Sequence, residues 1–456
     1  MTLLWAEQAL LPEGWARDVR VEIGPDGRIG RVEGGCQAPG AALRLGCLLP
    51  APVNLHSHAF QRAMAGLTEA RGPAPGDSFW TWRQLMYRFL DRLSPEDVQA
   101  IAAFVQMEML EAGFGASVEF HYLHHRPDGA VYDDLAEMSA RICAAAADSG
   151  IGLTLLPVLY EAGGCDGRPL GPGQVRFGND PDRFARLLDG ARAALAHLPG
   201  DARLGVAPHS LRAVSPAGLA AAADLGRGGP IHIHAAEQVA EVDEVRAHLG
   251  ARPVAWLLDR AGVGPGWCLI HCTRMEPAET LALAASGAVA GLCPITESSL
   301  GDGIFDGVRY LGAGGRIGLG SDSNIRISLA EELRTLEYSQ RLRDGSRAAL
   351  ATADLSTGRR LWQAAAAGGA EAAGRVAGAI RPGALADLVA LDMDHPDLGG
   401  RAGDMIPDTF AFAGDSAMVA DVWSAGRHLV TGGRHLRRDA IVSGYRRVQA
   451  RLRAAL

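Results

Sequence analysis

Histidine and carboxylate side chains stand at the ends of short apolar runs in this 456-residue sequence. The first pair, His56 and His58, follows the run CLLPAPVNL. Side chains two residues apart on a strand point to the same side, so both imidazoles would face one interior. Two neutral imidazoles can hold one divalent ion, most commonly Zn²⁺ in hydrolases. An isolated pair of this kind is more often a hydrogen-bonded part of a polar pocket.

A second cluster lies at the end of the run PIHIHA, where His232 and His234 are followed by Glu237. Either histidine could be a ligand. Because His234 precedes Glu237 by three residues, an imidazole and a carboxylate can converge just beyond the strand, where acid–base chemistry needs them. His232 lies one side-chain pair further down the strand, and we expect it to be buried in the core.

Two further runs end in a polar side chain, CLIH at His271 and RIGLGSD at Asp322. A lone histidine or aspartate in such a position is more often structural. Here, however, separate runs all deliver imidazole or carboxylate groups to the same end of the predicted strands. This arrangement indicates one catalytic centre.

Compact apolar runs recur along the middle of the chain, most of them followed by an Ala-rich and Leu-rich stretch of helical period. They read CLLPAPVNL, GASVEFHY, GLTLLPVLY, RLGVAP, PIHIHA, CLIHC, AVAGLCP and RIGLGS. Such strand–helix units predict an α/β fold, a (β/α)8 TIM barrel, in which catalytic residues lie at the C-terminal ends of the strands. A doubly wound open sheet would use similar units, but its phosphate-binding pattern GxGxxG is absent after the first strand.

The two ends of the chain carry short alternating segments with Gly turns, such as DVRVEIGPDGRIGRVEGG and AMVADVWSAGRHLVTGG. They predict β-hairpins that pack together as a small β-sandwich domain built from both termini. We therefore divide the chain into residues 1–49, the first part of the sandwich, 50–378, the barrel, and 379–456, the rest of the sandwich plus a terminal helix.

The composition excludes several classes of protein. A net charge of -8 gives no basic surface for nucleic acid, and no apolar run is long enough to span a membrane. The N-terminus lacks the pattern of a signal peptide, so we expect a cytoplasmic protein. Seven scattered cysteines without a CxxC pair argue against a disulfide framework. The sequence contains no lysine, which excludes Schiff-base chemistry and a carbamylated lysine bridging two metals.

Taken together, these residues resemble the amidohydrolase superfamily, and its mononuclear deaminase branch above all. The resemblance extends over essentially the whole chain and implies one divalent metal per subunit, Zn²⁺ or alternatively Fe²⁺. The implied ligands are His56, His58, His234 and Asp322.

The resemblance also implies a mechanism in which the metal lowers the pKa of a bound water towards ~7. His271 and Asp322 would orient that water and take its proton. Glu237 would protonate the substrate nitrogen and help to expel ammonia, which requires a raised pKa.

Further polar residues near the predicted strand ends favour an anionic substrate, since a guanidinium can bind a carboxylate through two hydrogen bonds. The patterns HSHAFQR, FHYLHH, APHSLR, HIHAAEQ and CPITESSLGDG resemble the formimidoylglutamate deiminases. That resemblance implies a small anionic substrate, N-formimino-L-glutamate, converted to N-formyl-L-glutamate and ammonia, and a homodimer. The residues that match its substrate contacts are Gln61, Arg83, Tyr122, His209 and Arg212.

Other interpretations stay open. A related deaminase could act on guanine, an adenosine derivative or a triazine, although a flat neutral base would not require two arginines. A non-catalytic barrel scaffold would normally have lost metal ligands. Arg212 alone could form a surface salt bridge, and the excursion 66–92, which carries Arg83, could be a lid, a subunit contact or simple packing. The run CPITESSLGDG could close over the site, or its residues Thr296, Glu297, Asp302 and Gly303 could equally shape a turn. We do not expect them to take part in catalysis.

Overall fold

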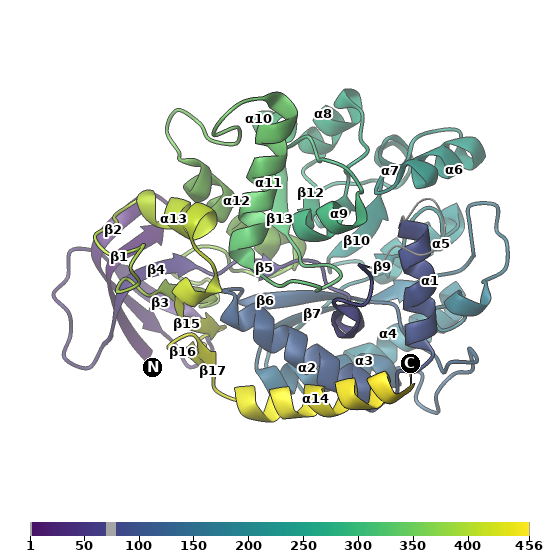
Figure 1. Ribbon diagram of the computed structural model, residues 1–456, viewed down its shortest axis with the longest axis horizontal. Helices are drawn as coiled ribbons and strands as arrows, with labels where there is room; N and C mark the ends of the chain where they lie inside the picture. Colours follow the sequence, from purple (N-terminus) through teal and green to yellow (C-terminus); the bar gives the residue numbers. More distant parts are fainter. Residues whose placement is uncertain (1, 70–78, 456) are drawn as a thin grey trace.

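Parallel strands surrounded by helices form the larger part of the molecule in the computed structural model, which describes residues 2–69 and 79–455 (Figure 1). The predicted excursion 66–92 thus lies partly outside the described residues. The barrel strands are β5 (Val53–Asn54), β6 (Ala116–His121), β7 (Gly152–Leu159), β8 (Arg203–Leu204), β9 (Ala207–Pro208), β10 (Ile231–Ala235), β11 (Trp267–His271), β12 (Val289–Leu292) and β13 (Arg316–Leu319). They coincide with the predicted apolar runs.

These strands form two parallel sheets that meet edge to edge. One sheet runs β5-β6-β7-β8, with β9 also paired to β7, and the other runs β10-β11-β12-β13. Parallel bridges pair Val206 with Ile231 at one seam and Ser57 with Asp322 at the other. At the second seam the amide of Leu55 also donates to the carbonyl of Leu319, with N and O 2.9 Å apart. The two sheets together therefore form the ring of a (β/α)8 barrel.

Helices follow the barrel strands, as the helical periods predict, and several begin at a capping side chain. Ser94, Asp180 and Ser215 each accept a hydrogen bond from the backbone N–H three residues further on. The helices are α1 (Phe79–Leu90), α2 (Pro95–Glu111), α3 (Glu137–Ser149), α4 (Pro181–Leu195), α5 (Pro216–Leu225), α6 (Val239–Leu249), α7 (Pro253–Arg260), α8 (Pro277–Ser286), α9 (Pro294–Leu300), α10 (Gly307–Gly312), α11 (Leu329–Asp344) and α12 (Thr357–Ala372).

Both ends of the chain contribute to a single mixed sheet beside the barrel. Its strand order is β17-β16-β15-β14-β4-β1-β2-β3. The strands are β1 (Thr2–Leu11), β2 (Gly14–Ile23), β3 (Ile29–Glu33), β4 (Leu43–Pro50), β14 (Leu388–Leu391), β15 (Val419–Ser424), β16 (Arg427–Thr431) and β17 (Arg434–His435). The sheet curls over a small apolar core, and the amide of Ile29 bonds the carbonyl of Ala384 across the curl at 2.8 Å. The predicted sandwich of two terminal segments is thus one continuous, curved sheet.

The first apolar run, CLLPAPVNL, is divided between the two sheets. Its first half belongs to β4, which pairs with β1 and β14, and only Val53–Asn54 joins the barrel as β5. Pro52 lies between the halves and has no N–H to donate to either ladder. The run was predicted as one barrel strand, so this part of the prediction is wrong. The division into residues 1–49, 50–378 and 379–456 stays a prediction.

Two helices near the C-terminus pack on the barrel rather than on the terminal sheet. Helix α13 (Met405–Ala413) lies against α11 and α12, where the rings of Trp362 and Phe410 meet with centroids 5.2 Å apart. Helix α14 (Arg438–Ala455) lies beside α2 along the lower edge of Figure 1, with Tyr445 stacked on Phe104. The C-terminal segment therefore spans both parts of the molecule.

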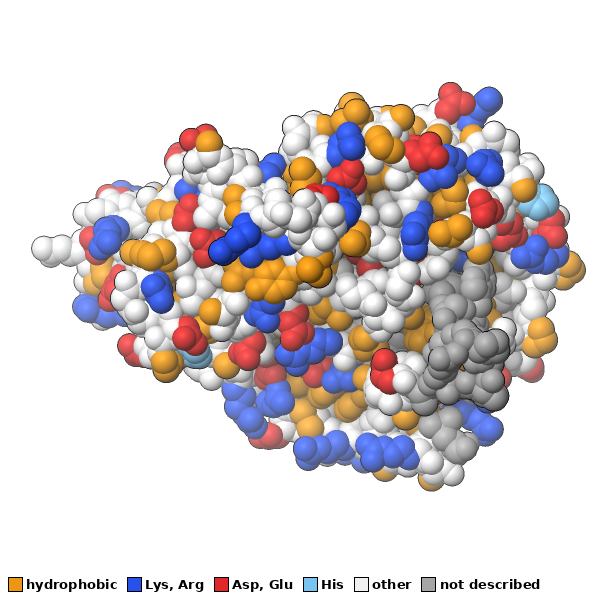
Figure 2. Space-filling model, turned by 45° about the horizontal axis from the view of Figure 1, so that its top comes forward, with side chains coloured by type: hydrophobic (Ala, Val, Ile, Leu, Met, Phe, Trp, Pro, Cys, Tyr) orange, Lys and Arg blue, Asp and Glu red, His pale blue; other side chains and the backbone are white. Residues whose placement is uncertain are grey.

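The face of the molecule shown in Figure 2 carries side chains of both charges. Acidic and basic side chains are intermixed over most of the face shown in Figure 2, and they do not gather into one basic surface there. Among the described residues, no helix combines the length and the apolar composition of a membrane span.

Candidate active site

The predicted site residues meet at the C-terminal ends of the barrel strands. His56 and His58 follow β5, His234 belongs to the end of β10, His271 ends β11, and Asp322 follows β13. All of them are buried. The barrel topology therefore brings together side chains that lie far apart in the sequence.

The backbone turns sharply at these strand ends. Ala236, His271 and Asp322 have φ angles of 52°, 70° and 46°, in the left-handed region that residues other than glycine seldom adopt. Such strain persists only where the surrounding structure holds it, and it is concentrated at functional sites. Here the turn directs His271 and Asp322 into the mouth of the barrel.

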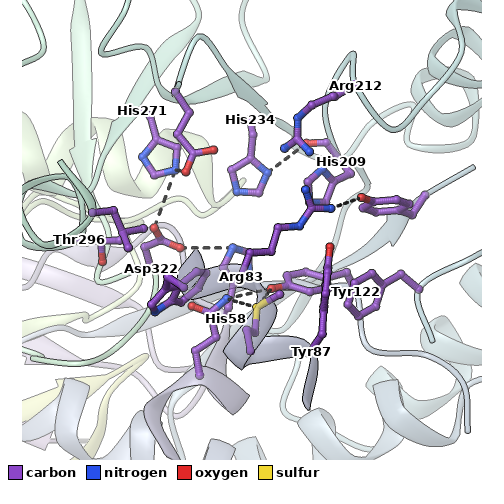
Figure 3. Close-up of a pocket in the computed structure, with 17 residues that line it drawn as sticks. His58, Arg83, Tyr87, Tyr122, His209, Arg212, His234, His271, Thr296 and Asp322 are labelled. Carbon is purple, nitrogen blue, oxygen red and sulfur yellow. Dashed lines mark hydrogen bonds and ion pairs between the residues drawn. The ribbon is translucent and has the colours of Figure 1, made fainter. Parts of the chain in front are cut away.

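Three imidazoles and one carboxylate converge on a common centre, and Figure 3 shows His58, His234 and Asp322 of this group. The ligand atoms of His56, His58 and His234 lie within 4.8 Å of one another. The Oδ1 atom of Asp322 is 3.3 Å from Nε2 of His58 and 3.5 Å from Nε2 of His56. These are the residues predicted to bind a metal.

The outer hydrogen bonds of the rings determine which nitrogens face the centre. Nδ1 of His58 donates to the carbonyl of Phe120, and Nδ1 of His234 donates to the carbonyl of His209, each at 3.0 Å. A carbonyl can only accept, so Nδ1 carries the proton and the Nε2 lone pair of each neutral ring faces inward. This is the arrangement in which imidazole binds a metal.

The centre fits a single divalent cation. Nε2 of His56 and Nε2 of His234 lie only 3.2 Å apart, and lone pairs that face each other at this distance repel unless a cation or a proton lies between them. Burial lowers the pKa of His56 to about 3 and that of His234 far below its ordinary value, so both rings are neutral near neutral pH and available as metal ligands. The neutral imidazoles and one carboxylate form a donor set suited to Zn²⁺.

Carboxylates and a histidine capable of proton transfer line one side of this centre. Nε2 of His271 is 3.8 Å from Oδ2 of Asp322 and 3.8 Å from Oε1 of Glu237. Burial raises the pKa of Glu237 to about 7. Burial opposes the charged form of His271, but Glu237 and the other carboxylates near the ring raise its pKa to about 10. Glu237 can thus exchange a proton near neutral pH.

A pocket leads from this centre to a second group of polar residues. Figure 3 shows His271, Thr296 and Asp322 on one side and His209 and Arg212 on the other. The residues predicted to contact the substrate all line this pocket: Gln61, Arg83, Tyr122, His209 and Arg212. The chemical centre and the two guanidiniums therefore share one cavity.

Contacts within the pocket hold several of these side chains. Gln61 donates through Nε2 to the hydroxyl of Tyr122 at 2.8 Å, while its buried Oε1 has no hydrogen-bond partner among the described residues. Arg83 donates to the hydroxyl of Tyr160 at 3.1 Å and lies over the ring of Tyr87. The Gln61 oxygen can accept a hydrogen bond from a bound molecule.

The structure separates other residues near these motifs from the site. Arg62, which follows Gln61, pairs with Glu108, with Nε and Oε2 2.7 Å apart. His232 is fully buried and its Nε2 donates to the carbonyl of Ala372 at 2.7 Å. It therefore lies in the core, as the strand period predicts.

Several residues of the site were not predicted from the sequence. Glu297 contacts Nδ1 of His271 at 3.3 Å, a contact that was not predicted for its segment. Its position shortly after an apolar strand run was the available signal. The pocket is completed by Trp82, Met86, Tyr87, Tyr160, Phe177, Thr296 and Leu300. Trp82, Arg83, Met86 and Tyr87 come from α1, so the excursion after the first strand forms one wall of the pocket.

The fold and the site define a class of metal-dependent hydrolases. A model of the amidohydrolase family matches residues 47–429, and the chain belongs to this family. A model described as the N-terminal domain of formimidoylglutamate deiminase HutF matches residues 1–44.

Individual relatives agree with this assignment. The chain is 50% identical over 437 residues to formimidoylglutamate deiminase from Pseudomonas aeruginosa, a match that covers 95% of this chain and 96% of the relative. It is 47% identical to an amidohydrolase from Brucella melitensis, with a TM-score of 0.95 and coverage of 99% and 100% of the two chains. An adenosine deaminase from Xanthomonas campestris, solved with bound zinc, has the same fold, with a TM-score of 0.82 at 21% identity and coverage of 99% and 98%.

Proposed function

We propose that this chain is a hydrolase that converts N-formimino-L-glutamate and water to N-formyl-L-glutamate and ammonia, a step of histidine degradation. The similarity to the Pseudomonas aeruginosa enzyme over nearly the whole length of both chains supports this activity. The observation that carries the proposal is the shared cavity. A metal centre with proton-transfer groups lies at one side, and two guanidiniums suited to carboxylates lie at the other.

The metal would be held by His56, His58, His234 and Asp322. When bound, a divalent ion supplies the Lewis acidity that activates water for attack on the formimino carbon. Zn²⁺ in preference to Fe²⁺ is part of the proposal and is supported by the three imidazoles and one carboxylate of the donor set.

Asp322, His271 and Glu237 have separate roles in orienting the water and in transferring protons. Asp322 and His271 orient the attacking water, since both approach the centre from strand ends. His271, with a pKa raised to about 10, is already protonated at neutral pH, so Asp322 accepts the proton of the water. Glu237 donates a proton to the formimino nitrogen, which leaves as ammonia as the carbon–oxygen double bond of the formyl group forms. Its buried carboxyl, with a pKa raised to about 7, can hold that proton at neutral pH.

The other side of the pocket holds the glutamate part of the substrate. Arg83 and Arg212 bind its carboxylates, and Gln61, Tyr122 and His209 fix its orientation through hydrogen bonds. Burial, together with the charges of Arg212 and Arg83, holds the pKa of His209 far below its ordinary value, so this ring is neutral. The positive charge that binds the carboxylates of the substrate thus comes from the two arginines.

A homodimer and a cytoplasmic location belong to the same proposal. The dimer rests on the resemblance to the family. The location is supported by the cysteines, all seven of which are unpaired, as is usual in a reducing compartment.

Ammonia release from defined substrates tests the proposed activity. The zinc-loaded protein is expected to release ammonia from N-formimino-L-glutamate and to form N-formyl-L-glutamate, detected by proton NMR. Guanine, adenosine derivatives and a triazine serve as comparison substrates. Turnover of these bases without turnover of N-formimino-L-glutamate would contradict the proposal.

A further inference from the structure

We propose that Glu297 is a positioning residue that fixes the orientation of the His271 ring. This inference rests on the proposed function, in which His271 orients the attacking water. It assigns a role to a residue of the segment after β12, the only barrel strand between β10 and β13 whose end provides none of the predicted catalytic residues.

Glu297 occupies the first turns of α9, directly behind the His271 ring. Its Oε1 lies 3.3 Å from Nδ1 of His271 and also accepts the backbone N–H of Cys293 at 2.8 Å. The carboxylate is buried, with 5% of the residue exposed. The Cys293 contact fixes the carboxylate to the start of α9, so a rigid group faces the ring.

This contact determines which nitrogen of His271 works in the pocket. The carboxylate oxygen accepts a hydrogen bond from Nδ1–H, which holds the ring with Nε2 on its opposite side. Nε2 is the atom that faces Asp322 and Glu237, each 3.8 Å away.

The chain offers a matched control in Glu332. Its Oε2 accepts the backbone N–H of Ile295 at 3.0 Å, and the residue is fully buried. Both glutamates therefore brace the start of α9 through a backbone amide. In the described part of the chain, only Glu297 of the two contacts His271. Replacing each by leucine, which removes the acceptor, therefore separates support of the helix from an effect on the ring.

The experiment compares E297L, E332L and the wild-type chain in their zinc-loaded forms. Imidazole NMR reports the hydrogen bond of the His271 Nδ1–H group, whose signals are assigned with H271N, and steady-state kinetics gives kcat and KM. We expect E297L to lose this hydrogen bond and to lower kcat by roughly 10-fold to 100-fold, the usual effect of removing such an outer partner. KM, zinc content and Tm should match those of E332L.

The inference is overturned if the His271 signals in E297L match those of the wild-type chain and kcat equals that of E332L. It is equally overturned if both variants lose activity together with bound zinc, because Glu297 would then act only through the helix. A wild-type chain that is inactive on N-formimino-L-glutamate contradicts the proposed function but not this inference. The hydrogen bond of the ring is measured without substrate and still decides whether Glu297 positions His271.

Discussion

His58 and Asp322 face each other across the seam that closes the barrel, with Nε2 and Oδ1 3.3 Å apart. Two backbone hydrogen bonds reinforce this approach. The amide of His58 donates to the carbonyl of Asp322, and the amide of Asp322 donates to the carbonyl of His56, both at 2.9 Å. A buried network supports the same seam, in which Asn324 donates to Ser57 at 3.2 Å. Closure of the barrel and assembly of the metal centre are therefore one structural event.

Replacing His58 by alanine tests the metal centre. The variant loses an inward-facing imidazole, and we expect zinc affinity to fall by more than about 100-fold, since loss of an outer partner alone can cost that much. Activity should fall with it. Zinc content after dialysis against a graded chelator measures the change. H232N is the control, because His232 lies on β10 of the same barrel but its side chain bonds Ala372 in the core. It should lower stability and keep zinc, and wild-type zinc affinity in H58A would exclude the assignment.

Glu237→Gln separates proton transfer from metal binding. The glutamine has nearly the same size but cannot donate the proton that Glu237 carries, so kcat should fall by about 10²-fold to 10⁴-fold. Zinc content and KM should change little, because Glu237 is not among the proposed ligands. Single-turnover ammonia release measures the chemical step. A variant that retains near wild-type turnover would show that another group protonates the leaving nitrogen.

The positions of the candidate site residues could be predicted because they follow simple geometric rules, whereas their proposed roles came from the family resemblance. Strand periodicity placed His56 and His58 on one face and His232 in the core, and the barrel rule gathered the strand ends. These relations depend only on local sequence and on the fold class. The same rules could have directed attention to the end of β12, where Glu297 lies.

Contacts made by loops and helices could not be predicted in the same way. Arg62 and Arg83 have the same side-chain chemistry in the sequence, yet one pairs with Glu108 on α2 and the other donates to Tyr160 in the pocket. The difference depends on how α1 and α2 pack against the barrel. Similarly, the division of the first apolar run between two sheets depends on pairing with β14, far away in the chain.

Substrates that lack one carboxylate can assign the two arginines. Arg212→Gln should lower kcat/KM for N-formimino-L-glutamate by roughly 10-fold to 100-fold, since a hydrogen bond to a charged group contributes about 1.5–3 kcal/mol. The loss should nearly vanish for the analogue that lacks the carboxylate bound by Arg212. N-formimino-4-aminobutyrate lacks the α-carboxylate, and N-formimino-2-aminobutyrate lacks the side-chain carboxylate. The same pair of analogues with Arg83→Gln should give the opposite pattern, and equal losses on both analogues would contradict separate carboxylate sites.

A buried ion network between the barrel and the terminal sheet makes stability depend on pH. Asp201, which precedes β8, pairs with Arg427 at 2.7 Å and with Arg375 at 3.2 Å, and Arg375 also pairs with Asp387 at 3.0 Å. Burial opposes the ionised form of Asp201, but the two arginines hold its pKa below the ordinary value. A carboxyl whose pKa is lower in the folded than in the unfolded chain stabilises the fold above its unfolded pKa, and this contribution is lost as the pH falls through the folded pKa.

Asp201→Asn should therefore lower the free energy of unfolding at pH 7 by roughly 1.5–3 kcal/mol, the range for hydrogen bonds to charged groups. The difference from the wild-type chain should shrink as the pH falls below about 4, where the unfolded carboxyl takes up its proton. Urea unfolding at a series of pH values measures it. Asp189→Asn removes an exposed pair with Arg192, whose atoms are 2.6 Å apart, and should change stability by less than about 1 kcal/mol. If D201N lowers the free energy of unfolding by the same amount at every pH, the packing of Asp201, and not its charge, stabilises the contact between the barrel and the sheet.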